Sequence, residues 1–108
     1  MSNEVQYDVL IIGSGASGLG LALQLPDSFK IAVLSKASLT SGSTYQAQGG
    51  VAAVLDDTDS TQAHIQDTIN AGANLSRRDA VAFTVEHGKE SIDWLIGQGA
   101  PFTRSPHE

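Results

Sequence analysis

Three glycines in the spacing G-x-G-x-x-G, at Gly13, Gly15 and Gly18, constrain this chain more than any other feature of its sequence. They directly follow the apolar, β-branched run at residues 7–12, which predicts a buried strand. They also open residues 16–25, where apolar side chains recur at helical spacing until a proline ends the pattern. A strand, a glycine-rich turn and a helix in this order are the context in which the spacing indicates dinucleotide binding.

A second strand is predicted at residues 30–34, Lys-Ile-Ala-Val-Leu. A strand, a helix and a strand in so short a stretch form a βαβ unit, so we expect two parallel strands with a right-handed crossover. Because both runs are almost entirely apolar, we expect each strand to be buried on both faces. The chain is therefore predicted to be of the α/β class.

Each glycine of the motif has a separate task in such a fold. Gly13 allows a tight turn, Gly15 lets a diphosphate approach the backbone, and Gly18 lets the helix pack closely on the strand. The helix N-terminus adds N–H groups and a partial positive charge of about +0.5, which favours an anion.

The end of the second strand carries Ser35 and Lys36. A dinucleotide fold usually has an acidic residue there, about 20 residues past the first glycine, for the ribose hydroxyls. A cation could instead bind the 2′-phosphate of NADP, or Lys36 could be a solvated loop residue. The spacing alone does not choose between these interpretations.

A long polar loop follows at residues 35–50. Residues 43–50, Ser-Thr-Tyr-Gln-Ala-Gln-Gly-Gly, supply hydroxyls, amides and two glycines, which suit a polar ring system and a diphosphate together. Loops of this length in a compact chain are usually functional or disordered. Next to the glycine motif, we expect this one to bind the cofactor. Residues 51–55 then form a short apolar run, either a strand or a buried turn of helix.

Two further helices are predicted. The first covers residues 60–73 and is capped by Asp59, with Gln62 completing a capping box. Its apolar face is expected to carry Ile65, Ile69 and Ala73. The second begins at Ser76, again with a capping-box pattern, and ends at Gly97 and Gly99. Its apolar stripe must face a core or a partner; the stripe consists of Val81, Val85, Gly88, Ile92, Leu95 and Gly99.

Composition excludes several classes of function. With 12 acidic and 6 basic residues the net charge is −6, which argues against nucleic-acid binding. The absence of cysteine excludes disulfides and thiolate chemistry. No signal peptide and no run of about 20 apolar residues is found, so we expect no membrane contact and a cytoplasmic location.

No metal site and no catalytic residue is predicted. Asp56, Asp57 and Asp59 suggest a calcium loop, but an EF-hand starting at Asp57 would have Gln62 where glycine is needed and Thr68 where glutamate is needed. His64 and His87 fall on predicted helices, where a surface or supporting role is commoner than a catalytic one.

Residues 9–18, Val33-Leu34-Ser35-Lys36, Gly42-Ser43-Thr44 and Ala47-Gln48-Gly49-Gly50 resemble the fumarate reductase/succinate dehydrogenase flavoprotein superfamily. The likeness covers essentially the whole chain and is strongest to the branch that oxidises L-aspartate. In this superfamily Ser-Lys ends the second strand, so the resemblance implies FAD and makes NADP less suitable. The fold implied is a Rossmann-type FAD-binding domain, of which residues 1–108 are the N-terminal part: a βαβ unit, a flavin loop and two helices.

The resemblance also implies which residues bind FAD. It assigns the diphosphate to Ser14, Gly15, Ala16 and Ser17, and it also places Gly13 and Gly18 in the cofactor site. Lys36 contacts the adenosine side. The flavin loop consists of Ser43, Thr44, Tyr45, Gln46, Ala47, Gln48, Gly49 and Gly50. Relatives that bind FAD covalently carry a histidine just before the loop threonine; because this chain has Ser43 there, we expect non-covalent FAD.

The activity implied is oxidation of L-aspartate to iminosuccinate, the first step of de novo NAD biosynthesis, with electrons passed to O₂ or fumarate. Quinolinate synthase would be the downstream partner. A soluble fumarate reductase and a catalytically incompetent nucleotide-binding fragment remain alternatives. The superfamily's substrate-binding and proton-transfer residues lie beyond residue 108, so we expect the rest of the flavin domain and a substrate-capping domain to be absent and this chain alone to be inactive.

Overall fold

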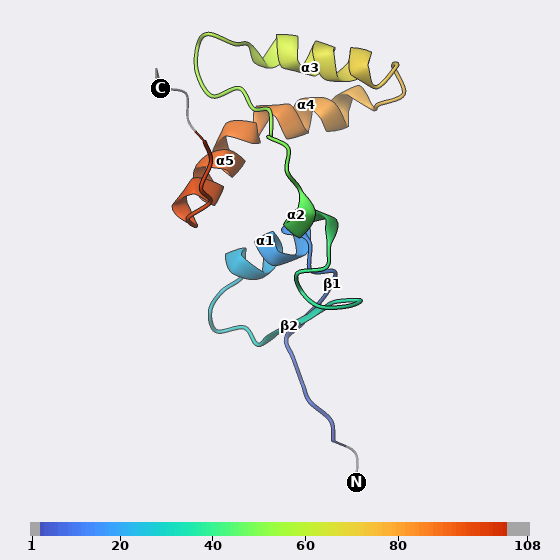
Figure 1. The fold of residues 1–108 in the computed structure, drawn as a ribbon, viewed down its shortest axis with the longest axis vertical. Helices are drawn as coiled ribbons and strands as arrows, with labels where there is room; N and C mark the ends of the chain where they lie inside the picture. The colour runs from blue at the N-terminus through green and yellow to red at the C-terminus, as the bar shows by residue number, and fades with distance from the viewer. Residues whose placement is uncertain (1–2, 104–108) are drawn as a thin grey trace. The chain divides into compact units, whose positions relative to one another are not determined.

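A computed structural model describes residues 3–103 of the chain, which divides into two compact units, Met1–Gly49 and Gly50–Glu108. Figure 1 shows the elements of both units as a ribbon. The first unit holds both strands, and the second holds the three longer helices of the C-terminal half.

The first unit is the predicted βαβ unit. Strand β1 (Val9–Ile12) is followed by helix α1 (Ala16–Gln24) and strand β2 (Ile31–Leu34). The strands pair in parallel, from Val9 opposite Ile31 to Ile12 opposite Leu34. Helix α1 ends just before Pro26, since a proline disfavours helical geometry in the residue before it. The predicted βαβ order and parallel pairing are confirmed.

The prediction that both strands are buried on both faces is wrong: no residue of β2 is buried, and in β1 only Ile11 is. Ile11 is only 7% exposed, whereas Leu10 is 62% and Ile12 79% exposed. Helix α1 packs on the side of Ile11, and side chains alternate between the two faces of a strand. In this two-stranded sheet, the face that carries Leu10 and Ile12 stays open.

The second unit contains helices α3 (Thr61–Ala71), α4 (Arg78–Glu86) and α5 (Gly88–Gly97). Its buried side chains are Ile65 and Ile69 on α3 and Ile92 on α5. Each lies on the apolar face of its helix. Residues 51–55 are neither the strand nor the helical turn that we expected, although Ala53 and Val54 are half-buried. Among residues 3–103, no helix is long and apolar enough to cross a membrane.

Helix α3 is capped one residue later than predicted. The Ser60 hydroxyl, not Asp59, accepts a hydrogen bond from the Ala63 N–H at 2.9 Å, and the Asp59 carboxylate instead accepts from the Ser60 N–H at 2.7 Å. The helix ends before Ala73, which takes a left-handed φ of 53° and so lies outside the apolar face where we expected it.

The predicted second helix is two helices, because the chain leaves helical geometry at His87, where φ is −96° and ψ is 4°. The Nδ1 atom of His87 lies 2.7 Å from the carbonyl oxygen of Phe83, so its side chain binds back onto the end of α4. The capping box at Ser76 is also wrong, since Arg77 is the N-cap residue of α4 and makes no side-chain cap. The stripe nevertheless continues across the break: Val81 and Val85 are half-buried and Ile92 is buried.

Candidate functional site

The turn between β1 and α1 depends on Gly13. Its φ of +115° lies in a region that side chains other than glycine rarely adopt. The Gly13 N–H donates to the carbonyl oxygen of Leu34 at 2.9 Å, which ties the turn to the end of β2. The tight-turn role expected of this glycine is confirmed.

Gly18 provides the close approach between helix and strand. A Cβ atom at this position would lie 2.1 Å from the carbonyl oxygen of Gly13 and 3.2 Å from Cγ2 of Ile11. The 2.1 Å distance cannot be accommodated without moving backbone, and the 3.2 Å distance would require a small shift of the Ile11 side chain, so α1 sits on β1 at a separation that only glycine permits. This role, too, is confirmed.

Gly15 differs from Gly13 and Gly18, the other two glycines of the motif. It is the N-cap of α1, with φ −78° and ψ −173°, an extended conformation open to any residue. A Cβ atom would meet only Oγ1 of Thr44, at an ordinary 3.5 Å. The protein itself therefore does not require glycine at this position, and the space beside its backbone is available to a ligand at the helix N-terminus.

The polar loop comes back to this helix end. Residues Ser43–Gln46 form a single helical turn, α2, within the segment that we expected to be a loop. The hydroxyl of Thr44 accepts a hydrogen bond from the N–H of Ala16 at 3.1 Å, across 28 residues of chain. The structure thus brings Gly15, Ala16 and Thr44 together.

A second link connects the glycine motif with the end of β2. The Ser14 hydroxyl donates to the Ser35 hydroxyl at 3.0 Å, and both residues are half-buried. Lys36, the next residue, is exposed. Ser17 is exposed on the first turn of α1.

The remaining residues of the loop are exposed. Tyr45 is 70% exposed, and Ser43, Gln46, Ala47 and Gln48 are exposed as well. Gly49 and Gly50 lie at the boundary between the two units. Their predicted contacts with the flavin remain predictions.

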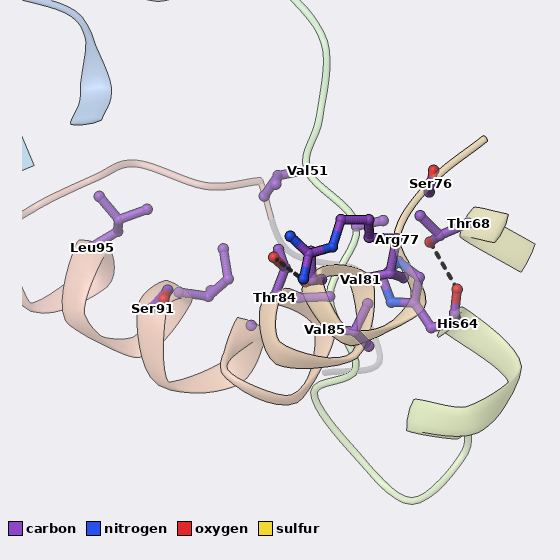
Figure 2. A pocket seen from close by; sticks show the side chains of 15 residues that line it. Val51, His64, Thr68, Ser76, Arg77, Val81, Thr84, Val85, Ser91 and Leu95 are labelled. Carbon is purple, nitrogen blue, oxygen red and sulfur yellow. Dashed lines mark hydrogen bonds between the residues drawn. The ribbon is translucent and has the colours of Figure 1, made fainter. Parts of the chain in front are cut away.

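An apolar groove of about 580 Å³ lies within the second unit. Figure 2 shows Val81, Val85 and Leu95 of the predicted stripe along it, together with His64 and Arg77. None of the residues predicted to bind the cofactor lines this groove. The periodicity predicted the apolar stripe, but no sequence signal placed His64 and Arg77 beside it.

The acidic turn at residues 56–59 is held by its own hydrogen bonds. The side-chain hydroxyl of Thr58 and then its backbone N–H donate to the Asp56 carboxylate, and these bonds lower the pKa of Asp56 from its usual 3.8. These contacts are those of a local turn.

Known proteins resemble this chain along nearly its whole length. Residues 8–108 match the FAD binding domain family. The chain is 65% identical over 104 residues to a Pseudomonas aeruginosa protein named L-aspartate oxidase, covering 96% of this chain and 19% of that protein. It is 59% identical over 97 residues to the L-aspartate oxidase of Acinetobacter baylyi, covering 90% of this chain and 18% of that protein.

Among solved structures, a quinol fumarate reductase from E. coli with a mutation in FrdA matches with a TM-score of 0.85 and 36% identity. The match covers 95% of this chain and 18% of that one. The chain therefore spans only about a fifth of the length of the relatives that it matches.

Proposed function

Because this chain belongs to the FAD binding domain family, we propose that it is the N-terminal part of an FAD-dependent oxidoreductase that converts L-aspartate to iminosuccinate. FAD is the cofactor of the family. In this proposal the electrons pass to O₂ or fumarate, and the catalytic and substrate-binding residues belong to parts of the protein outside this chain.

The observation that carries the proposal is the 65% identity, over almost the whole chain, to a protein named L-aspartate oxidase. That likeness covers 19% of the relative. The part of the reaction that these residues can support is cofactor binding.

The geometry of the glycine motif fits FAD. Gly15 leaves space at the N-terminus of α1, where N–H groups and the helix dipole favour a diphosphate. When bound, FAD supplies the redox chemistry, and the protein supplies binding and orientation. We propose that residues 13–18 hold the diphosphate, Lys36 the adenosine side, and residues 43–50 the diphosphate and flavin. The cofactor is held non-covalently, because a serine at position 43 lacks the imidazole nitrogen that forms the covalent bond in histidine-linked relatives.

The test uses the purified full-length protein with its bound flavin. Under anaerobic conditions, L-aspartate should bleach the flavin's visible absorbance, and D-aspartate should not. Admitting O₂ or adding fumarate should restore the absorbance. Flavin that L-aspartate leaves oxidised would overturn the proposed substrate.

A soluble fumarate reductase is the second candidate, and the backbone likeness to quinol fumarate reductase favours it. The same preparation discriminates the two. Succinate should reduce the flavin if this candidate is correct, and fumarate should oxidise a reduced viologen dye rapidly without any aspartate-dependent reaction.

The cellular setting of the enzyme is also a proposal. We propose a cytoplasmic location and quinolinate synthase as the partner that consumes iminosuccinate, following the resemblance to the aspartate-oxidising branch. Cell fractionation and co-purification of the full-length protein would test them separately.

A further inference from the structure

A short chain of hydroxyl groups joins the glycine motif to the loop after β2. The Ser14 hydroxyl donates to Oγ of Ser35 at 3.0 Å, and the Ser35 hydroxyl donates to the carbonyl oxygen of Ser38 at 3.4 Å. Directly beside it, the Gly13 N–H donates to the Leu34 carbonyl oxygen at 2.9 Å. Two neighbouring residues of the turn are thus bound to two neighbouring residues at the end of β2.

The direction of these bonds limits what each serine can do for a ligand. A hydroxyl carries a single donor hydrogen. That of Ser14 is directed at Ser35, so in this arrangement it cannot also donate to a diphosphate. An anion at the motif would then depend on backbone N–H groups, whose position depends on how firmly the turn is held.

Ser35 occupies the position at the strand end where a dinucleotide fold usually carries an acid for the ribose. Here its hydroxyl accepts from one side and donates to the other, and both partners belong to the protein. The residue is half-buried, so its bond with Ser14 is partly shielded from water. Through Ser38 it also holds the loop in which Lys36 lies.

We infer that Ser35 is a positioning residue for FAD, which holds the turn at Ser14 and the loop around Lys36 in the arrangement that binds the cofactor. The inference rests on the proposed function, because it takes the motif to be an FAD site. It assigns Ser35 an effect on cofactor affinity through Ser14 rather than by touching FAD.

The test measures the dissociation constant of FAD for the full-length apoprotein, by quenching of flavin fluorescence, in Ser35→Ala, Ser14→Ala and the double variant. A single hydrogen bond corresponds to about a threefold to tenfold change in affinity. We expect each single variant to weaken binding by about this factor and the double variant to weaken it by no more than one of them, since both remove the same bond.

Two further variants separate positioning from general damage. Ser35→Thr keeps the hydroxyl, so its dissociation constant for FAD should lie within about twofold of that of the unmodified protein. This change is smaller than the loss of one hydrogen bond would cause. Ser41→Ala is the matched control, because the Ser41 hydroxyl donates to the same Ser38 carbonyl oxygen, at 2.7 Å, without reaching Ser14. It should leave affinity unchanged. With FAD saturating, kcat and KM for L-aspartate should be the same in Ser41→Ala as in the unmodified protein.

Unchanged FAD affinity in Ser35→Ala, or effects of the two single variants that add in the double variant, would overturn the inference. So would a loss in Ser41→Ala as large as that in Ser35→Ala. The proposed function fails in a different way: L-aspartate would then leave the flavin of the full-length protein oxidised, whatever the serine variants do.

Discussion

Gly15→Val in the full-length protein should remove FAD while leaving the fold largely intact. The backbone at Gly15 is extended, so valine introduces no left-handed strain. The new Cβ atom would touch only Thr44 Oγ1, at 3.5 Å. Valine is a poorer N-cap than glycine, and we expect this to cost about 1 kcal/mol or less of stability.

The cost to the cofactor is larger, because the branched side chain fills the space where the diphosphate would meet the backbone. Losing even one hydrogen bond to a charged group costs about 1.5–3 kcal/mol, and the helix-dipole attraction adds about 0.3–1 kcal/mol. The sum, roughly 2–4 kcal/mol, corresponds to a weakening of about 30-fold to nearly 1,000-fold. We therefore expect the purified variant to contain little flavin.

The assay compares the flavin absorbance per mole of purified protein and the melting temperature of the apoprotein. Gly20→Val is the matched control: the same substitution in the same helix, at a site where a Cβ atom meets nothing within 4 Å. Gly18→Ala is unsuitable as a control, because its Cβ atom would lie 2.1 Å from a carbonyl oxygen and disturb the fold itself. Normal flavin content in Gly15→Val would refute the assignment of the diphosphate site.

Three further predictions follow from other residues. Because Ser43 stands where some relatives carry the linking histidine, acid denaturation of the full-length protein should release all flavin into the supernatant; fluorescence that stays with the protein band on a denaturing gel would contradict this. The carboxyl pKa of Asp56, followed by NMR, should lie below 3.8, and Thr58→Val should raise it, because the bond from the Thr58 hydroxyl is the largest cause of the shift; an unchanged pKa would show that this bond is not formed in solution. Residues 1–108 alone should bind FAD weakly or not at all and should not melt cooperatively, as calorimetry and circular dichroism would measure.

The parts of the fold that could be predicted from the sequence are those decided by neighbouring residues. The two β-branched runs and the glycine spacing fix β1, the turn and α1, because the required backbone angles and close contacts exist only for glycine at Gly13 and Gly18. The face of α3 that carries Ile65 and Ile69 could be predicted equally well, since helical spacing places both residues on one side of the helix.

The features that the sequence did not predict depend on choices that the neighbouring residues leave open. Asp59 and Ser60 can each cap a helix, and the sequence does not say which oxygen reaches the free N–H groups. The apolar pattern continues on both sides of His87, so its spacing does not indicate that a helix ends there. Residues 51–55 are apolar and short, a case in which strand and helix are hard to tell apart from sequence. The link between Thr44 and Ala16 spans 28 residues and had no local signal at all.

The accessible surface of the chain is the strongest support for our prediction that residues 1–108 alone do not form a self-sufficient domain. The chain exposes 8839 Å². Two separate compact proteins, each of half its mass of 11.3 kDa, would together expose roughly 6,900 Å², so the surplus does not depend on how the two units are arranged. Leu10 and Ile12 on the open face of β1 contribute to it. An open apolar sheet face favours aggregation, and each contact not made there lowers a stability that is only about 5–15 kcal/mol in a complete domain. The isolated chain should therefore unfold gradually on heating. A sharp melt together with micromolar FAD binding would contradict this prediction, because it would show that the chain folds with this extra accessible surface exposed and needs no partner to cover it.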